Sequence, residues 1–348
     1  MEQPARLLSA SVIHALDFSA WKRSALRQCF FGARMVYIQN AAEVPAGGVL
    51  AVWGMKPVIG DLAPGVRILR LEDGFLRSVG LGADLIRPMS WVVDARGMYY
   101  VATRPSDLEH LLAETTITPA LAQRAARLRL RIVAEGLTKY NVGVSGWQRP
   151  TGVRKVILVP GQVESDASLA YGAPKLKSNI GLLQAVRQAH PEAYVVYKPH
   201  PDVMAGLRAR GAGEAEAQRW CDELVTDVAM GDLLMAVDEV HVLTSLAGFE
   251  ALLRGKPVTC YGQPFYSGWG LTMDVVPNPR RGRRLSLDEL VAGALIEYPL
   301  YLSRMSDALI TPEQALDELL VWRAKTGNTV PWWRQYFRMG LRLVMGAR

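Results

Sequence analysis

Two carboxylates follow a short apolar run in the segment VPGQVESDAS, residues 159–168. Glu164 and Asp166 lie two residues apart at the expected end of a buried strand, where they form either a solvated turn or half of a catalytic site. A carboxylate in such a place can act as a nucleophile or as a general base. The polar side chains of other segments at the same edge decide between these interpretations.

A basic pair occurs in a second segment, YKPHP, at residues 197–201. Lys198 and His200 flank Pro199, and Pro201 follows directly, so the backbone is held extended. A lysine ammonium and a histidine imidazole on a rigid turn suit one phosphate group. A solvated surface turn is the alternative interpretation of the same residues.

A helix amino terminus is the third candidate, in TSLAGFEALLRGKPV at residues 244–258. Thr244 or Ser245 caps a helix directly after an apolar run, and Gly255 ends it. The amino terminus of a helix is an anion site. Glu250 lies in the first turns of this helix, where its carboxylate either takes the two hydroxyls of a ribose or faces solvent.

Strand-like runs precede these segments and recur along most of the chain. They end in Gly, Pro or polar residues and cover residues 48–54, 66–74, 90–102, 155–162, 193–200, 238–245 and 256–262. Helix patterns lie between them, with capping boxes predicted at Ser286 with Glu289 and at Thr311 with Gln314. This alternation favours an α/β fold of parallel sheets covered by helices, which bind ligands at the carboxyl ends of their strands.

The length of 348 residues suits two α/β domains of ordinary size. The segment NVGVSGWQRPTGVRK, residues 141–155, is rich in Gly, Pro and Arg and is the best boundary. We expect a first Rossmann-like domain at residues 1–145 and a second at residues 155–303. Residues 304–348 are expected to form C-terminal helices with a basic amphipathic tail.

The cysteines and the hydropathy indicate the compartment. Cys29, Cys221 and Cys260 have no C-x-x-C spacing, so neither a disulfide framework nor a zinc ribbon is supported, and a reducing cytoplasm is the expected location. The amino terminus lacks a cationic segment followed by a continuous apolar one, and no apolar run is long enough to span a bilayer. We expect a cytoplasmic protein that does not cross the membrane.

The net charge of +7 is concentrated near the end of the chain, because residues 323–348 contribute +6 and contain no acid. The remaining +1 argues against nucleic-acid binding by the body of the protein. In PWWRQYFRMGLRLVMGAR, residues 331–348, arginines recur every four residues beside an apolar stripe. Such a helix either lies peripherally on an anionic membrane surface or packs on the core of the protein.

Four segments resemble the motifs of the capsule polysaccharide synthesis family, the KpsC-like retaining β-Kdo glycosyltransferases. They are RLEDGFLRSVGLGADL at residues 70–85, VPGQVESDAS, YKPHP, and LTSLAGFEALLRGKPVTCYGQPFYSGWGLT at residues 243–272. The resemblance extends from about residue 48 to residue 303. It implies a GT-B-like fold, in which two Rossmann-like domains face a cleft, and transfer of 3-deoxy-D-manno-oct-2-ulosonic acid (Kdo) from CMP-β-Kdo with retention. Better known capsule enzymes carry two such modules, and this chain has room for one.

The resemblance also implies two catalytic carboxylates, a nucleophile and an acid or base, among Asp166, Glu164 and Glu72. It favours Asp166 over Glu164 as the nucleophile. Glu72, which would reach across the cleft from the first, acceptor-side domain, is then the acid or base on the acceptor hydroxyl. Retention is most simply achieved by two displacements, the first by the enzyme carboxylate and the second by the acceptor.

The substrate ligands are expected around these carboxylates. Arg77 either binds the Kdo carboxylate or forms an ion pair with Asp73, and Gln162 is a candidate ligand of a sugar hydroxyl. The aromatic residues of PFYSGWG, residues 264–270, suit the wall of a sugar or cytosine site. The expected CMP-sugar site in the second domain comprises Lys198, His200, Pro201, Thr244, Ser245 and Glu250. The other four histidines, expected to be structural or superficial, are His14, His110, His190 and His241.

The expected chemistry requires neither a metal nor a cofactor beyond the donor CMP-β-Kdo. The leaving group has a single phosphate, which one lysine, one histidine and a helix amino terminus can stabilise. The chain contains no D-x-D motif, which favours a metal-independent enzyme over one whose divalent ion bridges a diphosphate.

The expected partners are CMP-Kdo and a glycan or glycolipid acceptor of capsule or surface polysaccharide biosynthesis. The alternative is a non-catalytic module that binds glycan or scaffolds a polysaccharide export assembly. Glu72, Asp166, Lys198 and His200 occur together, which a scaffold does not need and an enzyme does.

Overall fold

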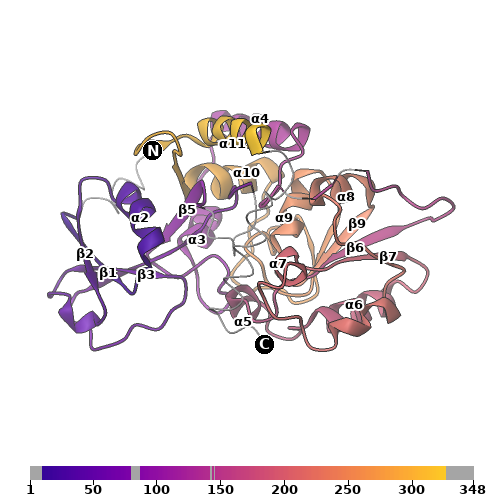
Figure 1. Ribbon diagram of the computed structural model, residues 1–348, viewed down its shortest axis with the longest axis horizontal. Helices are drawn as coiled ribbons and strands as arrows, with labels where there is room; N and C mark the ends of the chain where they lie inside the picture. The colour runs from indigo at the N-terminus through magenta and orange to yellow at the C-terminus, as the bar shows by residue number, and fades with distance from the viewer. Residues whose placement is uncertain (1–9, 80–86, 142, 145, 327–348) are drawn as a thin grey trace.

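The computed structural model describes residues 10–79, 87–141, 143–144 and 146–326. In this part of the chain, two β-sheets lie side by side with helices over and between them (Figure 1). The tail at residues 331–348, for which a membrane helix or a packed helix is expected, lies outside the described residues.

The first sheet is mixed, with the strand order β13-β12-β5-β4-β3-β1-β2. Neighbours among β1 to β4 pair in parallel, whereas β5, β12 and β13 join in antiparallel fashion. Counted from β1, the first five strands have the order 2-1-3-4-5 of a flavodoxin-like sheet. The strands are β1 (Val12–Leu16), β2 (Arg34–Ile38), β3 (Val49–Trp53), β4 (Arg67–Asp73), β5 (Ser90–Asp94), β12 (Pro299–Leu302) and β13 (Leu309–Ile310).

The second sheet is parallel throughout, with the order β11-β10-β9-β6-β7-β8. Counted from β6, this is 3-2-1-4-5-6, the order of the Rossmann sheet. Runs of β-branched residues buried on both faces explain why these strands form in its centre. The strands are β6 (Val156–Pro160), β7 (Tyr194–Lys198), β8 (Glu223–Leu224), β9 (Glu239–Val242), β10 (Val258–Cys260) and β11 (Met273–Asp274).

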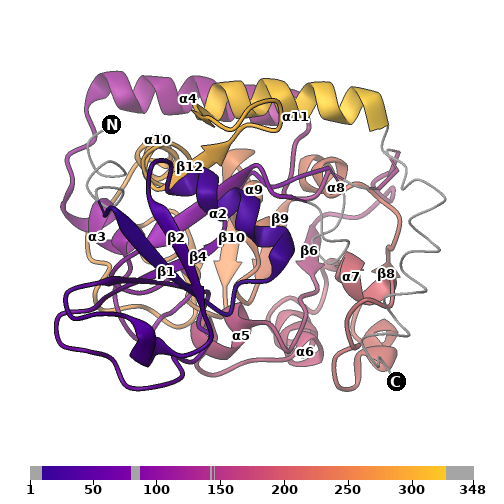
Figure 2. The ribbon, with the colours of Figure 1, turned by 60° about the vertical axis from the view of Figure 1, so that its left-hand side comes forward.

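Helices cover both faces of the second sheet, with α5 and α6 on one face and α8 and α9 on the other. Helices α4 and α11 lie next to each other along one side of the molecule, as both views show (Figures 1 and 2). The helices are α2 (Arg23–Cys29), α3 (Asp107–Glu114), α4 (Pro119–Ala134), α5 (Ala167–Gly172), α6 (Asn179–Ala189), α7 (Pro201–Met204), α8 (Met230–Ala236), α9 (Leu246–Leu253), α10 (Leu287–Val291) and α11 (Pro312–Thr326). Shorter helical turns are η1 (Ala20–Lys22), η2 (Ala41–Glu43), η4 (Glu214–Arg219) and η5 (Ala292–Glu297).

Both predicted capping boxes are present. The Ser286 hydroxyl accepts a hydrogen bond from the Glu289 amide at 3.3 Å, and the Glu289 carboxylate accepts one from the Ser286 amide at 2.8 Å, at the start of α10. Thr311 and Gln314 exchange the same two bonds, at 3.3 and 2.9 Å, at the start of α11. These helices therefore begin where their sequences satisfy the first amide groups locally.

Two expectations about the strands need correction. The run at residues 90–102 ends as a strand at Asp94, because the buried Asp94 carboxylate accepts hydrogen bonds from the amides of Arg96 and Gly97 at 2.9 and 2.7 Å and forms a turn there. Residues 299–302, at the end of the expected second domain, form β12 and pair with β5 in the first sheet. The chain therefore returns to the first half after completing the second.

The apolar core is continuous between the two halves. One cluster of buried side chains includes Phe75 and Leu108 from the first half and Val156 and Val240 from the second. Phe75 stacks on Phe265 with ring centroids 4.4 Å apart. The two sheets are thus joined by packed side chains as well as by the chain.

Across the described ranges, no helix combines the length and the apolar character needed to span a membrane.

Candidate active site

A cavity of about 890 Å³ lies between the halves, at the carboxyl ends of β4, β6, β7 and β9. This is the edge at which open α/β sheets bind ligands. The cavity is lined by every predicted site residue except Glu164, namely Glu72, Asp73, Arg77, Gln162, Asp166, Lys198, His200, Pro201, Thr244, Ser245 and Glu250. His14, His110, His190 and His241 are absent from its wall.

The two carboxylates of VPGQVESDAS point to different places. Asp166 is exposed in the cavity wall and caps α5, where its carboxylate accepts a hydrogen bond from the Ser168 amide at 3.4 Å. Glu164 accepts hydrogen bonds from the backbone amides of Asn179 and Ala212 at 2.8 and 3.1 Å. The structure therefore brings Asp166 to the cavity and uses Glu164 to hold neighbouring backbone.

Gln162 links the end of β6 to the end of β9. These strands are neighbours in the second sheet, and the strand order changes direction between them. Its amide nitrogen donates to the Thr244 hydroxyl at 3.0 Å, and its carbonyl oxygen accepts from the Thr244 amide at 2.9 Å. Asn179, at the start of α6, exchanges two further bonds of 2.9 Å with the backbone of Gln162. The side chain of Gln162 thus fixes the loop that carries Asp166 relative to the end of β9.

Glu72 enters the cavity from the end of β4. Burial and then the neighbouring charge of Asp73 raise its pKa to about 7, against the opposing effects of the Asp73 amide and the Lys22 ammonium. At Gly54 the φ angle is +53°, and a β-carbon would lie 3.0 Å from the Glu72 carboxylate and from the Tyr100 hydroxyl. This packing holds a carboxyl that takes up or releases a proton near neutral pH.

Of the two interpretations of Arg77, the ion pair with Asp73 is formed. The Arg77 Nε atom lies 2.6 Å from the Asp73 carboxylate, and the guanidinium also donates to the Ser78 hydroxyl at 3.0 Å. Arg77 is buried with 3 % of its surface exposed and the Asp73 side chain is 19 % exposed, so this pair is partly shielded from solvent. It fixes the turn after β4 while one side of Arg77 borders the cavity.

Lys198 and His200 lie together on the opposite side of the cavity. The Lys198 ammonium donates to the Thr226 carbonyl at 2.9 Å, and burial lowers its pKa to about 8 although Asp227 opposes the shift. Burial and the charges of Lys139 and Arg208 lower the pKa of His200 to about 3, so its imidazole is neutral. Its Nδ1 atom accepts the Asp202 amide at 3.2 Å, which leaves the proton on Nε2 as a hydrogen-bond donor.

The amino terminus of α9 completes this side of the cavity. Ser245 is its cap and accepts a hydrogen bond from the Ala247 amide at 3.2 Å. Glu250 is buried, and one of its oxygens accepts the Lys139 amide at 2.6 Å. Burial raises the pKa of Glu250, although Arg254 and this amide act against the rise.

Two lysines that line the cavity were not predicted. The Lys22 ammonium lies 3.0 Å from the centroid of the Trp53 ring, and burial lowers its pKa to about 8 against the attraction of Glu72 and Asp73. The Lys139 ammonium lies 5.2 Å from the centroid of the Tyr140 ring. Lys22 follows a strand that the sequence analysis does not identify. Lys139 lies just before the predicted domain boundary at residues 141–155. This position could have indicated a cavity residue, because a segment that crosses between two domains borders the cleft between them.

The segment PFYSGWG contributes less to the cavity than expected. Pro264 and Phe265 line it, whereas Tyr266 and Trp269 are completely buried. The Tyr266 hydroxyl donates to the Ser245 carbonyl and so supports the start of α9. Most of these aromatic residues therefore build the wall from behind.

Two solved structures of transferases have a fold similar to that of this chain. Thermosulfurimonas dismutans KpsC, beta Kdo 2,7 transferase, is 40% identical, with a TM-score of 0.76 over 89% of this chain and 99% of that chain. Thermosulfurimonas dismutans KpsC, beta Kdo 2,4 transferase, is 32% identical, with a TM-score of 0.77 over 88% of this chain and 97% of that chain.

A curated relative and a family model agree with this similarity. The capsule polysaccharide modification protein LipA of Neisseria meningitidis serogroup B is 41% identical over 318 residues, which are 88% of this chain and 45% of that protein. The chain thus spans about half the length of this relative. The model described as capsule polysaccharide biosynthesis protein matches residues 58–143 and 147–305. The chain therefore belongs to the capsule polysaccharide biosynthesis protein family and is KpsC-like.

Proposed function

We propose that the protein is a retaining, metal-independent β-Kdo glycosyltransferase with a GT-B arrangement of its two halves. CMP-β-Kdo is the donor, and a glycan or glycolipid of capsule or surface polysaccharide biosynthesis is the acceptor. The observation that carries the proposal is the placement of Glu72 and Asp166, from different halves, in one cavity with Lys198 and His200. The similarity to the two KpsC beta Kdo transferases supports the choice of sugar.

The CMP group is proposed to lie on the second half. The Lys198 ammonium supplies positive charge to the phosphate, and the Nε2–H group of the neutral His200 donates a hydrogen bond to it. The first amide groups of α9 add a partial positive charge. One carboxylate oxygen of Glu250 accepts the hydrogen bond of the Lys139 amide, and the second oxygen accepts hydrogen bonds from the ribose hydroxyls.

The sugar transfer proceeds in two displacements. The Asp166 carboxylate attacks the anomeric carbon, the bond from this carbon to the phosphate oxygen breaks, and CMP leaves with the electron pair. Glu72 then takes the proton of the acceptor hydroxyl, whose oxygen displaces Asp166 from the anomeric carbon. Two inversions give net retention.

The carboxylate of Kdo is proposed to face the cations on the acceptor side. Arg77 and Lys139 border the cavity there, and both lie close enough to Asp73 for its charge to affect their pKa values. A carboxylate placed beside them gains the attraction of the Lys139 ammonium and shares the Arg77 guanidinium with Asp73.

The experiment supplies CMP-Kdo without an acceptor and measures the mass of the intact protein. The wild-type protein should become heavier by one Kdo residue, because the second displacement has no acceptor to complete it. Asp166→Asn should show no adduct and should lose turnover by orders of magnitude. Glu164→Gln is the matched control and should retain the adduct, since Glu164 lies outside the cavity wall and accepts hydrogen bonds from backbone amides.

Two outcomes would contradict this mechanism. An adduct that persists in Asp166→Asn and disappears in Glu164→Gln would show that Glu164, and not Asp166, is the nucleophile. Binding of CMP-Kdo with neither adduct nor transfer to any acceptor would instead indicate a non-catalytic module.

A further inference from the structure

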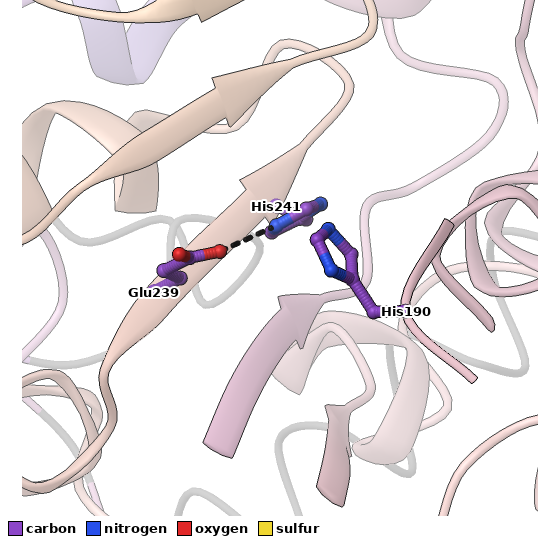
Figure 3. A group of neighbouring side chains, drawn as sticks. All are labelled: His190, Glu239 and His241. Atoms are coloured by element: carbon purple, nitrogen blue, oxygen red, sulfur yellow. Dashed lines mark hydrogen bonds and ion pairs between the residues drawn. The ribbon is translucent and has the colours of Figure 1, made fainter. Parts of the chain in front are cut away.

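A cluster of two histidines and a glutamate lies in the second half, outside the cavity wall. Glu239 and His241 are two residues apart on β9 and project from the same face of the sheet. His190 is the residue that ends α6. Figure 3 shows the three side chains pointing toward one another, and their potential ligand atoms all lie within 4.8 Å of one another.

We propose that His190, Glu239 and His241 bind one divalent transition-metal ion, for which zinc is the best match. Two imidazoles and one carboxylate are a common zinc ligand set, with water in a fourth position. The site is independent of the proposed transfer reaction, because none of the three residues lines the cavity.

The spacing of two of the ligands already fits a tetrahedral ion. The His241 Nε2 atom lies 3.3 Å from a Glu239 oxygen. Bonds of about 2.0–2.1 Å at tetrahedral angles place two ligand atoms about 3.3 Å apart. The His190 ring lies perpendicular to that of His241, with centroids 5.0 Å apart, and is partly exposed. The proposal therefore requires the His190 side chain to rotate so that one of its ring nitrogens reaches the ion.

The protonation states of the three groups suit metal binding. Burial lowers the pKa of His241 to about 4, and burial also lowers that of His190, so both imidazoles are neutral at pH 7. Burial acts to raise the pKa of Glu239, but hydrogen bonds from Lys155 and His241 outweigh it and keep the carboxylate ionised.

A partner for the far side of His241 is also in place. The Tyr261 hydroxyl lies 3.4 Å from His241 Nδ1. When the ion occupies Nε2, the proton moves to Nδ1, and the hydroxyl accepts a hydrogen bond from it instead of donating one. Such a second contact orients the imidazole of a metal ligand.

Lys155 is the charged group that opposes the ion. Its ammonium lies 2.8 Å from the other oxygen of Glu239. An ammonium this close to the ligand Glu239 repels a divalent cation bound there. The affinity for zinc should therefore be lower than that of a structural zinc site with four protein ligands. Lys155 thus provides a variant that is expected to strengthen binding, which an unspecific surface site would not show.

Zinc titration of chelator-treated full-length protein, followed by calorimetry, tests the site. The wild-type protein should bind one zinc ion per chain, and added cobalt should give the visible d–d bands of a four-coordinate ion. His190→Gln and Glu239→Gln should each weaken zinc binding by more than about 100-fold. Lys155→Gln should strengthen it by about tenfold.

His110→Gln is the matched control, because His110 lies 3.0 Å from Glu114 in a pair to which the described residues add no third ligand. This variant should bind zinc as the wild type does. Circular dichroism and the melting temperature in chelator show whether each variant is folded. Absence of binding to the wild-type protein, or equal binding to folded His190→Gln, would overturn the proposal. Unchanged affinity in Lys155→Gln would place the ion away from Glu239 and overturn it as well.

Discussion

Glu72 and Lys22 show how neighbouring residues set the proton affinity of single side chains in the cavity. The pKa of Glu72 is about 7 because it is partly buried beside Asp73, and that of Lys22 is about 8 because it is partly buried against Trp53. Each of these two groups partly offsets the shift of the other. Both therefore change charge close to neutral pH, where a proton acceptor for a hydroxyl is most effective.

The pH dependence of transfer tests Glu72 as the base. Wild-type kcat/KM should rise as the pH passes through 7, because the ionised form of Glu72 accepts the proton of the acceptor. Glu72→Gln should lower kcat by about 10²- to 10⁴-fold and should lack this rise. The measurement is a profile from about pH 5 to about pH 9 with CMP-Kdo and a glycan acceptor.

The stability of the same variant has an expected sign. The pKa of Glu72 is about 7 in the folded protein against 4.5 for a free glutamate, so the unfolded chain releases its proton first as the pH rises. This difference destabilises the folded state progressively between those values and fully above them. Glu72→Gln should therefore raise the melting temperature near pH 8 and have little effect near pH 4. In the activity measurement, a Glu72→Gln variant whose kcat/KM keeps the wild-type dependence on pH would show that another group is the base.

At the scale of elements, three short helices present their first residues to the cavity. Asp166 caps α5, His200 caps α7 and Ser245 caps α9, and all three caps line the cavity. The first backbone amides of a helix have no acceptor within the helix, and a capping side chain accepts only one of them. The remaining amides favour negative charge near the start of the helix. The strand ends of the second sheet thus place the proposed nucleophile and the proposed phosphate ligands on one edge.

His200 has two roles that a pair of substitutions separates. Its Nδ1 atom caps α7, and its Nε2–H group is proposed to bind the CMP phosphate. His200→Ala should weaken CMP binding by about tenfold and lower the free energy of unfolding by about 1 kcal/mol. His200→Asn retains a capping oxygen, so it should unfold like the wild type yet bind CMP as weakly as the Ala variant. Calorimetric titration with CMP measures the affinity, and normal affinity in His200→Asn would make His200 a structural residue.

At the scale of the whole molecule, buried contacts hold the two halves around the cavity. Glu109 of α3 accepts hydrogen bonds from Arg280 at 2.6 Å and from Arg281 at 3.0 Å. Glu109 and Arg281 are both buried, so the pair is shielded from solvent. Strand β12 adds a second connection, because it leaves the second half and pairs with β5.

Loss of the Glu109 charge should destabilise the folded protein strongly. In Glu109→Gln the Arg281 guanidinium stays buried without its partner carboxylate, which should lower the free energy of unfolding by about 3–5 kcal/mol. Glu135→Gln breaks the more exposed pair with Arg323, 3.4 Å apart, and should lower it by less than about 1 kcal/mol. Denaturant titration measures both, and equal losses would show that the Glu109 pair does not hold the halves together.

The basic tail makes a separate prediction about the location of the protein. We propose that residues 331–348 hold the protein at an anionic membrane surface, because arginines and an apolar stripe alternate in this segment. Removal of these residues should release the protein from anionic vesicles in a sedimentation assay and leave transfer to a soluble acceptor unchanged. Unfolding or precipitation of the shortened protein would instead indicate that the tail packs on the core.

The sequence by itself determined the family and the local structure near the strand ends. The apolar runs before VPGQVESDAS, YKPHP and TSLAGFEALLRGKPV predicted strands that the structure contains as β6, β7 and β9. The capping boxes of α10 and α11 were predictable for the same reason, since their partners lie three residues apart. Parallel strands end at one edge of a sheet, so the site residues could be grouped before their distances were known.

Only the tertiary structure decided which way the side chains of this edge point. Glu164 turns to amides that lie 15 and 48 residues further along the chain, and no local pattern indicates such partners. Lys22 and Lys139 reach the cavity because η1 and the segment that crosses between the halves border it, although neither lysine lies in a motif. The return of β12 to the first sheet depends on pairing with β5, about 200 residues earlier in the chain. Contacts of this kind follow from packing between distant segments, which local propensity does not encode.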